Sequence, residues 1–176
     1  MKILGLAVLV VLVAGVGGPK ESRPPVQTVK AVDLARYMGK WFEIAAFPQR
    51  FQKGCHCTTA EYELTAKGTV RVVNTCRRGG PDGKATRAKA KAWAVPGSGN
   101  AKLKVRFFWP FTGNYWIIDL AGDYSYAVVG DPTRKYLWIL ARTPRMDPGL
   151  YAEVVGRAAA QGFDTSKLVA ADQSCW

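Results

Sequence analysis

Histidine is almost absent from this chain of 176 residues, which contains His56 alone, and acidic residues are scarce, with 13 Asp and Glu against 25 Lys and Arg. A single imidazole cannot form a histidine metal cluster, nor a serine triad without unusual partners. Repeats and low-complexity blocks are missing too, while 48% of the residues are hydrophobic, which excludes a wholly disordered chain. We expect one folded domain that is not an enzyme and needs no cofactor.

Long apolar runs are also lacking, apart from the one between Ile3 and Val16. That run is shorter than the roughly 20 residues of a membrane-spanning helix. A charged start, an apolar middle and small residues at the end are typical of a secretory signal, which we predict over residues 1–18, with a retained membrane anchor as the alternative. No cysteine follows the run, which argues against a bacterial lipoprotein anchor. We therefore expect export to the periplasm or cell envelope, with association with the outer membrane as one outcome.

The formal net charge of +12 suits either a nucleic acid or an anionic membrane surface as a partner. Export argues against nucleic acid, so we expect none. Anionic lipid head groups would attract each basic residue near the surface by about 1 kcal/mol. The net charge does not indicate the oligomeric state, and a homodimer is compatible with it.

All four cysteines follow the predicted signal, at Cys55, Cys57, Cys76 and Cys175. An even number of cysteines in an exported protein favours disulfides. Zinc is the weaker alternative, because Cys55 and Cys57 are one residue apart, whereas structural zinc ligands are usually separated by two to four. Cys55 and Cys57 have the same parity, so this pattern permits either of them to pair with Cys76.

The domain after the signal has the rhythm of an antiparallel β protein. Residues 19–32 form a predicted extended lead-in, and residues 33–176 contain short β-branched and aromatic runs separated by Gly, Pro, Asn and Asp. The links are too short for crossover helices, so consecutive strands should pair. We predict eight strands, at Lys40–Phe47, Cys57–Leu64, Thr69–Arg77, Thr86–Val95, Lys102–Trp109, Asn114–Leu120, Tyr124–Gly130 and Tyr136–Arg142.

One helix is predicted near the end of the chain. Asp147 can cap it, Pro148 suits its first turn, and apolar residues recur at helical spacing up to Gly162. A last short strand at Lys167–Ala171 should follow. The predicted fold is all-β, an eight-stranded antiparallel up-and-down barrel with one C-terminal α-helix packed outside, because closure removes both sheet edges.

Alternation along the fourth strand indicates a partly open lumen. Arg87, Lys89 and Lys91 share the face that must meet water, so the alanines between them face inward. A row of alanines fills little volume, which leaves room for one small ligand. The alternative is a tight sheet packed against a helix.

Three ordered motifs resemble the lipocalins, in particular bacterial lipocalins and apolipoprotein D. Gly39-Lys40-Trp41-Phe42-Glu43 resembles their first signature, Asp123 to Val129 stands at the second, and Tyr136 to Pro144 is similar to the last strand with its terminal arginine. The stretch from Phe107 to Leu120 is also similar to this branch. The similarity spans about residues 33–172.

The resemblance assigns structural roles to Gly39, Trp41 and Arg142 at a closed end of the barrel. Arg142 should stack on Trp41 there. The predicted ligand-facing residues are Tyr62, Ala90, Ala92, Val105, Phe107, Trp138 and Leu140. Tyr62 is assigned by the resemblance and the others by strand alternation. For the aromatic residues, ordinary core filling is the alternative. Residues 48–51 should form a loop at the mouth.

The resemblance further implies a disulfide between Cys57 and Cys175, leaving Cys55 for Cys76. Glu43 has the same parity as Trp41, and we interpret it as an ion-pair partner of Arg142. His56 is interpreted as a rim residue, with a haem ligand as the alternative.

The implied function is binding, storage, transport or scavenging of a fatty acid or lysophospholipid in the cell envelope. One alternative is an envelope enzyme on the same scaffold, acting on a lipid or a tetrapyrrole through Cys55 or His56. A second alternative is an interaction module whose lumen is filled.

Overall fold

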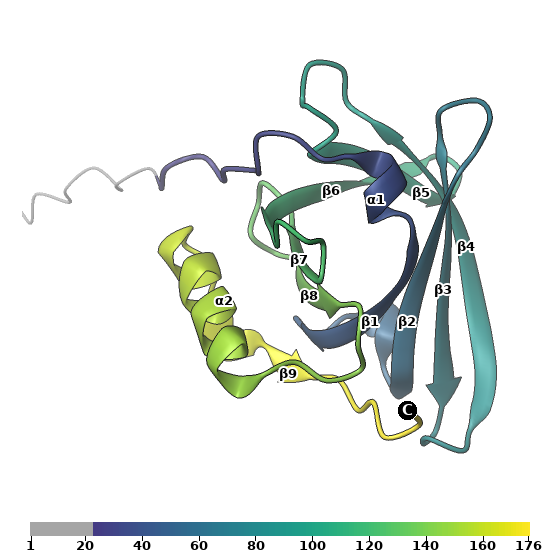
Figure 1. Ribbon diagram of the computed structural model, residues 1–176. Coiled ribbons are helices and arrows are strands. Elements are labelled where there is room, and N and C mark those ends of the chain that lie inside the picture. The colour runs from purple at the N-terminus through teal and green to yellow at the C-terminus, as the bar shows by residue number, and fades with distance from the viewer. Residues whose placement is uncertain (1–22) are drawn as a thin grey trace, which may run out of the picture.

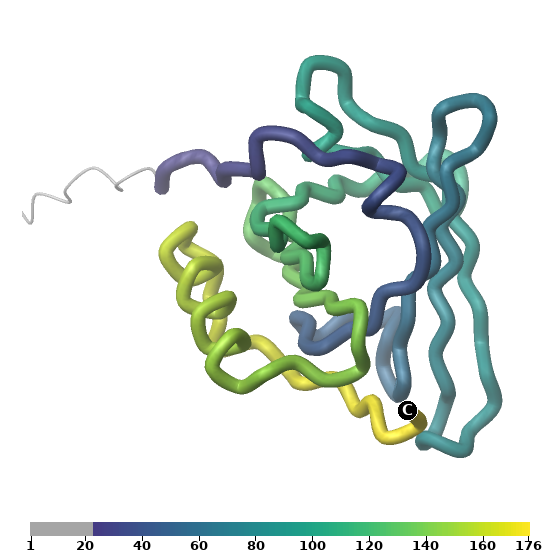
Figure 2. Tube along the Cα trace, in the orientation of Figure 1, coloured from purple at the N-terminus to yellow at the C-terminus, as the bar shows by residue number. Residues whose placement is uncertain are grey.

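The computed structural model describes residues 23–176, and Figures 1 and 2 show a barrel with one long helix against its outside. The predicted signal over residues 1–18 and the first part of the lead-in lie outside the described residues. The barrel strands are β1 (Gly39–Ala46), β2 (Cys55–Leu64), β3 (Val70–Arg78), β4 (Lys84–Ala94), β5 (Lys102–Phe108), β6 (Phe111–Leu120), β7 (Tyr126–Gly130) and β8 (Leu137–Ala141). The remaining elements are α1 (Leu34–Tyr37), η1 (Arg50–Gln52), α2 (Pro148–Ala160), η2 (Thr165–Lys167) and β9 (Val169–Ala170).

The barrel is closed by β1, which pairs with both β2 and β8. From β2 to β8, each strand pairs antiparallel with the next strand in sequence, so the predicted meander and the predicted fold class are confirmed. Closure gives each of the eight strands two neighbours and removes the free edges of the sheet.

The first half of β1 pairs with β2, up to Phe42 opposite Thr59. On its other side β1 pairs with β8 from Phe42 to Ala46, with a bulge between Glu43 and Ala45, and beyond this bulge β9 pairs with it in place of β2. The C-terminal segment fills the gap between the two separated strands. There Gln173 Nε2 donates to the backbone oxygens of Glu43 (2.7 Å) and Thr58 (2.8 Å), and the Cys57 amide donates to Asp172 O (2.6 Å). The sequence predicted a closed barrel but did not indicate that the C-terminal segment fills this gap.

Helix α2 begins as predicted, since the Asp147 carboxylate accepts from the Leu150 amide (2.9 Å). Its buried residues Val154 and Ala158 pack on the outer face of β7 and β8, where Leu137 and Ile139 point outward. Their neighbours Trp138 and Leu140 therefore point into the barrel, because side chains alternate along a strand. None of the helices in residues 23–176 is long and apolar enough to cross a membrane.

Candidate ligand-binding cavity

Trp41 and Arg142 close one end of the barrel. Trp41 is fully buried, and its indole nitrogen donates to Tyr37 O (2.9 Å). The Arg142 guanidinium carbon lies 3.8 Å from the centre of the Trp41 ring system. Arg142 also donates to the backbone oxygens of Lys40 (2.9 Å) and Arg36 (2.8 Å). Its donors thus hold α1 and β1 together, and this end has a structural role.

A cavity of about 120 Å³ lies above this floor. Six of the seven predicted ligand-facing residues line it, namely Tyr62, Ala92, Val105, Phe107, Trp138 and Leu140. The exception is Ala90, which is half-buried against the interior core and is not part of the lining. Ala90 pairs with Val72 on β3, but the β4–β5 pairing ends one residue away, at Lys91 with Arg106. The ligand-binding role of the seven residues stays a prediction.

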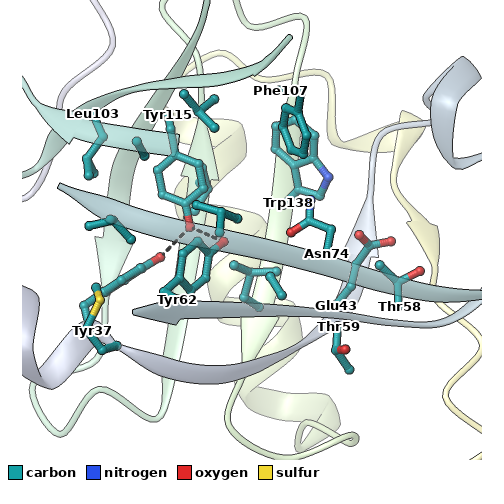
Figure 3. Close-up of a pocket in the computed structure, with 18 of the residues that line it drawn as sticks. Tyr37, Glu43, Thr58, Thr59, Tyr62, Asn74, Leu103, Phe107, Tyr115 and Trp138 are labelled. Carbon is teal, nitrogen blue, oxygen red and sulfur yellow. Dashed lines mark hydrogen bonds between the residues drawn. The ribbon is translucent and has the colours of Figure 1, made fainter. Parts of the chain in front are cut away.

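Three tyrosines form a hydrogen-bonded chain beside the floor (Figure 3). The hydroxyl of Tyr115 lies 2.8 Å from that of Tyr37 and 2.9 Å from that of Tyr62. Burial raises the pKa of Tyr62 to about 12 and raises the pKa values of the other two, so all three remain neutral donors. Tyr37 and Tyr115 were not predicted. The parity of Tyr115 with the buried Ile117 would have identified it as inward-facing, whereas Tyr37 lies on the short helix α1 and gave no such signal.

Glu43 corrects one prediction, because it makes no ion pair with Arg142 among the described residues. Glu43 lies two residues beyond Trp41 and therefore further from the closed end of the barrel. The Arg142 guanidinium donates instead to the backbone oxygens of Lys40 and Arg36. Glu43 Oε2 instead accepts from Gln52 Nε2 (2.7 Å). Burial raises the pKa of the Glu43 carboxyl, and the Gln52 hydrogen bond offsets part of that rise.

Gln52 links Glu43 to the cavity wall, since its Oε1 accepts from the Trp138 indole nitrogen (3.3 Å). It comes from η1 in the loop between β1 and β2. Arg78 anchors this loop by donating to the backbone oxygens of Phe51 (3.0 Å) and Lys53. Of residues 48–51, which were expected to form a loop at the mouth, Phe51 lines the cavity, and so does the next residue, Gln52.

The cysteines pair as Cys55 with Cys76 and Cys57 with Cys175, the pairing that the resemblance implies. Cys55 therefore has no free thiol to act as a nucleophile. His56 Nδ1 lies 2.8 Å from Asp172 Oδ2 and does not line the cavity, so the haem-ligand alternative receives no support from its position.

An aromatic hairpin stands beside the cavity, where β5 turns into β6. Phe108, Trp109 and Phe111 expose 67%, 81% and 68% of their surfaces, and Phe107, half-exposed, belongs to the lining. Large exposed apolar groups in one place usually mark an interaction surface.

Comparison with known proteins identifies the family. The sequence model of a lipocalin-like domain matches residues 32–173. Temperature-induced lipocalin-1 of Arabidopsis thaliana is 41% identical over 160 residues, covering 84% of this chain and 83% of that protein. The outer membrane lipoprotein Blc of Escherichia coli K12 is 37% identical over 170 residues, covering 96% and 94%.

A solved structure agrees with the fold. Insecticyanin from the tobacco hornworm Manduca sexta superposes with a TM-score of 0.68 at 23% identity, covering 86% of each chain. The closed barrel, the plugged floor and the match over nearly the whole described chain have one explanation: this protein belongs to the lipocalin-like family.

Proposed function

We propose that this protein binds a single-chain lipid, a fatty acid or lysophospholipid, in the barrel cavity and stores, carries or scavenges it without transforming it. The observation that carries the proposal is the cavity of about 120 Å³ above a plugged floor. One water needs about 10–15 Å³ of such space, so the cavity has room for a larger guest. Its walls are largely aliphatic and aromatic, as hydrophobic ligand sites are.

The energy of burial suits an acyl chain. Each methylene moved from water into an apolar site contributes about 0.8 kcal/mol, so about a dozen carbons outweigh the cost of association and give micromolar affinity. The family to which the chain belongs supports hydrophobic ligand binding in general. The choice of lipid is our proposal.

The place of action that we propose is the cell envelope, next to a membrane that carries anionic lipid. A relative named outer membrane lipoprotein supports the envelope location. The exposed aromatic hairpin and the exposed basic residues Lys84, Arg87 and Lys89 of β4 support the membrane partner. Aromatic rings favour the membrane interface, and basic side chains are attracted to anionic head groups.

Native mass spectrometry of protein purified from cells tests the proposal, and we expect a retained lipid. Titration with a fluorescent fatty acid should then give saturable uptake that Trp138→Ala weakens. Trp93→Ala is the matched control, because Trp93 does not line the cavity and instead lies under the Arg106 guanidinium (5.1 Å). No retained lipid and no saturable uptake, or equal uptake in both variants, would contradict the proposed site.

A further inference from the structure

The charge inside the cavity differs from the charge outside. The protein carries a net charge of +12, yet among residues 23–176 no Lys, Arg or His lines the cavity, and Glu43 is the one carboxyl group that does. The basic residues of β4 are exposed on the outer face. An anionic head group drawn into the cavity would therefore meet a carboxyl group and no cationic lining residue, since the Lys104 ammonium, which is not in the lining, donates to Asn114 Oδ1 (2.7 Å).

Unused polar groups lie near Glu43. Glu43 Oε2 accepts from Gln52, whereas Oε1 has no hydrogen-bond partner among the described residues. Asn74, on β3, also lines the cavity, and its buried Oδ1 has no hydrogen-bond partner within residues 23–176. Figure 3 shows Asn74 and Glu43 on the Trp138 side of the pocket, away from Tyr37. A buried acceptor left unpaired costs about 1–3 kcal/mol, which a donor on a bound molecule would recover.

At the other end of the cavity, near Tyr37, no buried side-chain polar atom of the described residues lacks a hydrogen-bond partner. The tyrosine hydroxyls there bond to one another. Aliphatic side chains of the lining lie beside these tyrosines, since Val72 pairs with Tyr62 and Leu103 pairs with Tyr115. A single-chain amphiphile would thus place its tail toward the floor and its head beside Glu43 and Asn74.

We infer that Glu43 and Asn74 form a head-group subsite that selects single-chain amphiphiles with a cationic, hydrogen-bond-donating head, such as a primary ammonium, over those with a carboxylate. This inference rests on the proposed function and narrows it. Of the two lipid classes proposed above, an ammonium-bearing lysophospholipid offers the donor that the subsite lacks beside its own anionic phosphate, whereas a free fatty acid offers only an anion. An ammonium group beside Glu43 would also offset the burial that raises the pKa of that carboxyl.

The test compares dodecylamine, dodecanol and dodecanoate, which share one chain length and differ in head group. Their dissociation constants would be measured by isothermal titration calorimetry on delipidated protein at neutral pH, below the micellar concentrations. We expect dodecylamine to bind at least about tenfold more tightly than dodecanoate, with dodecanol between them. This comparison needs no mutation, so it does not depend on whether a variant folds.

Glu43→Gln then tests the residue, because it removes the charge and keeps the shape. It should reduce the preference for dodecylamine over dodecanoate by about tenfold. Glu61→Gln is the matched control, since Glu61 is exposed on the adjacent strand β2 and does not line the cavity; it should leave the preference unchanged.

The outcomes separate the two proposals. If dodecanoate binds as tightly as dodecylamine, or Glu43→Gln leaves the preference intact, the subsite is wrong and lipid binding stands. If none of the three compounds binds, the proposed function itself fails.

Discussion

The Arg142 guanidinium lies against the Trp41 indole, 3.8 Å from the ring centre, and its remaining donors reach the backbone oxygens of Lys40 and Arg36. One side chain thus stacks on the barrel plug and fastens α1 and β1 around it. A planar fork with several donors can do both tasks at once, which an ammonium group cannot.

We predict that Arg142→Lys destabilises the fold although it keeps the charge. The ammonium cannot stack flat on Trp41 and reach two carbonyls, so the free energy of unfolding should fall by about 1–3 kcal/mol. Urea unfolding measures this loss. Arg145→Lys is the control, because the Arg145 side chain is exposed and forms no hydrogen bond or ion pair among the described residues. Equal stability of the two variants would contradict the structural role that we assign to Arg142.

Filling the cavity should block lipid uptake without unfolding the protein. Ala92 is buried in the lining, so Ala92→Phe places a ring where the ligand would lie, at a packing cost of about 1–3 kcal/mol. Uptake of a fluorescent fatty acid should fall by at least about tenfold, with an unchanged far-ultraviolet circular dichroism spectrum. Ala85→Phe is the control, since Ala85 is exposed and does not line the cavity. Normal uptake by the Ala92 variant would place the ligand elsewhere.

The two disulfides should differ in their contributions to stability. Cys57 and Cys175 are 118 residues apart in sequence, against 21 for Cys55 and Cys76. In the chain-entropy account, the longer loop adds about 1.5 kcal/mol more. The Cys57→Ser/Cys175→Ser double variant should therefore lose more stability in urea than Cys55→Ser/Cys76→Ser. The reverse order would show that strain or denatured-state structure outweighs loop length.

The difference in stability between the wild type and Glu43→Gln should depend on pH. Burial raises the pKa of Glu43 in the folded state above its usual value of 4.5, so the folded protein binds more protons than the unfolded chain between these two pKa values. Stability is then highest below 4.5 and falls as the pH rises through the folded pKa. Delipidated Glu43→Gln should match the wild type in acid and exceed it at neutral pH. Thermal melts across this range measure the gap, and a constant gap would refute the assignment.

The aromatic hairpin should govern membrane binding. Phe108→Ser with Trp109→Ser removes two exposed rings, each worth about 1.5–3 kcal/mol when buried. Sedimentation with phosphatidylglycerol vesicles should fall by at least about tenfold, and wild-type binding should weaken with salt and on phosphatidylcholine. Trp176→Ser provides a control at a second exposed tryptophan. If the control lost as much binding as the hairpin variant, the hairpin would not be the docking element.

The sequence alone determined the strand order, the closure into a barrel, the α2 cap at Asp147 and five cavity-lining residues, Ala92, Val105, Phe107, Trp138 and Leu140. These features depend on local turn chemistry and on alternation, which are written along a single strand. The motif around Trp41 and the distant Arg142 added the plugged floor, because the resemblance supplied a contact that spacing could not.

Only the tertiary structure decided what meets across the barrel. The inward direction of Glu43 follows from its parity with Trp41, but its partner Gln52 comes from a loop whose path depends on Arg78 and η1. Likewise Tyr37 reaches Tyr115 from a short helix that no periodicity marked, and Gln173 fills a gap that exists only because β1 and β2 separate. Such contacts join residues far apart in sequence, so their energies depend on how the whole sheet closes and no local pattern encodes them.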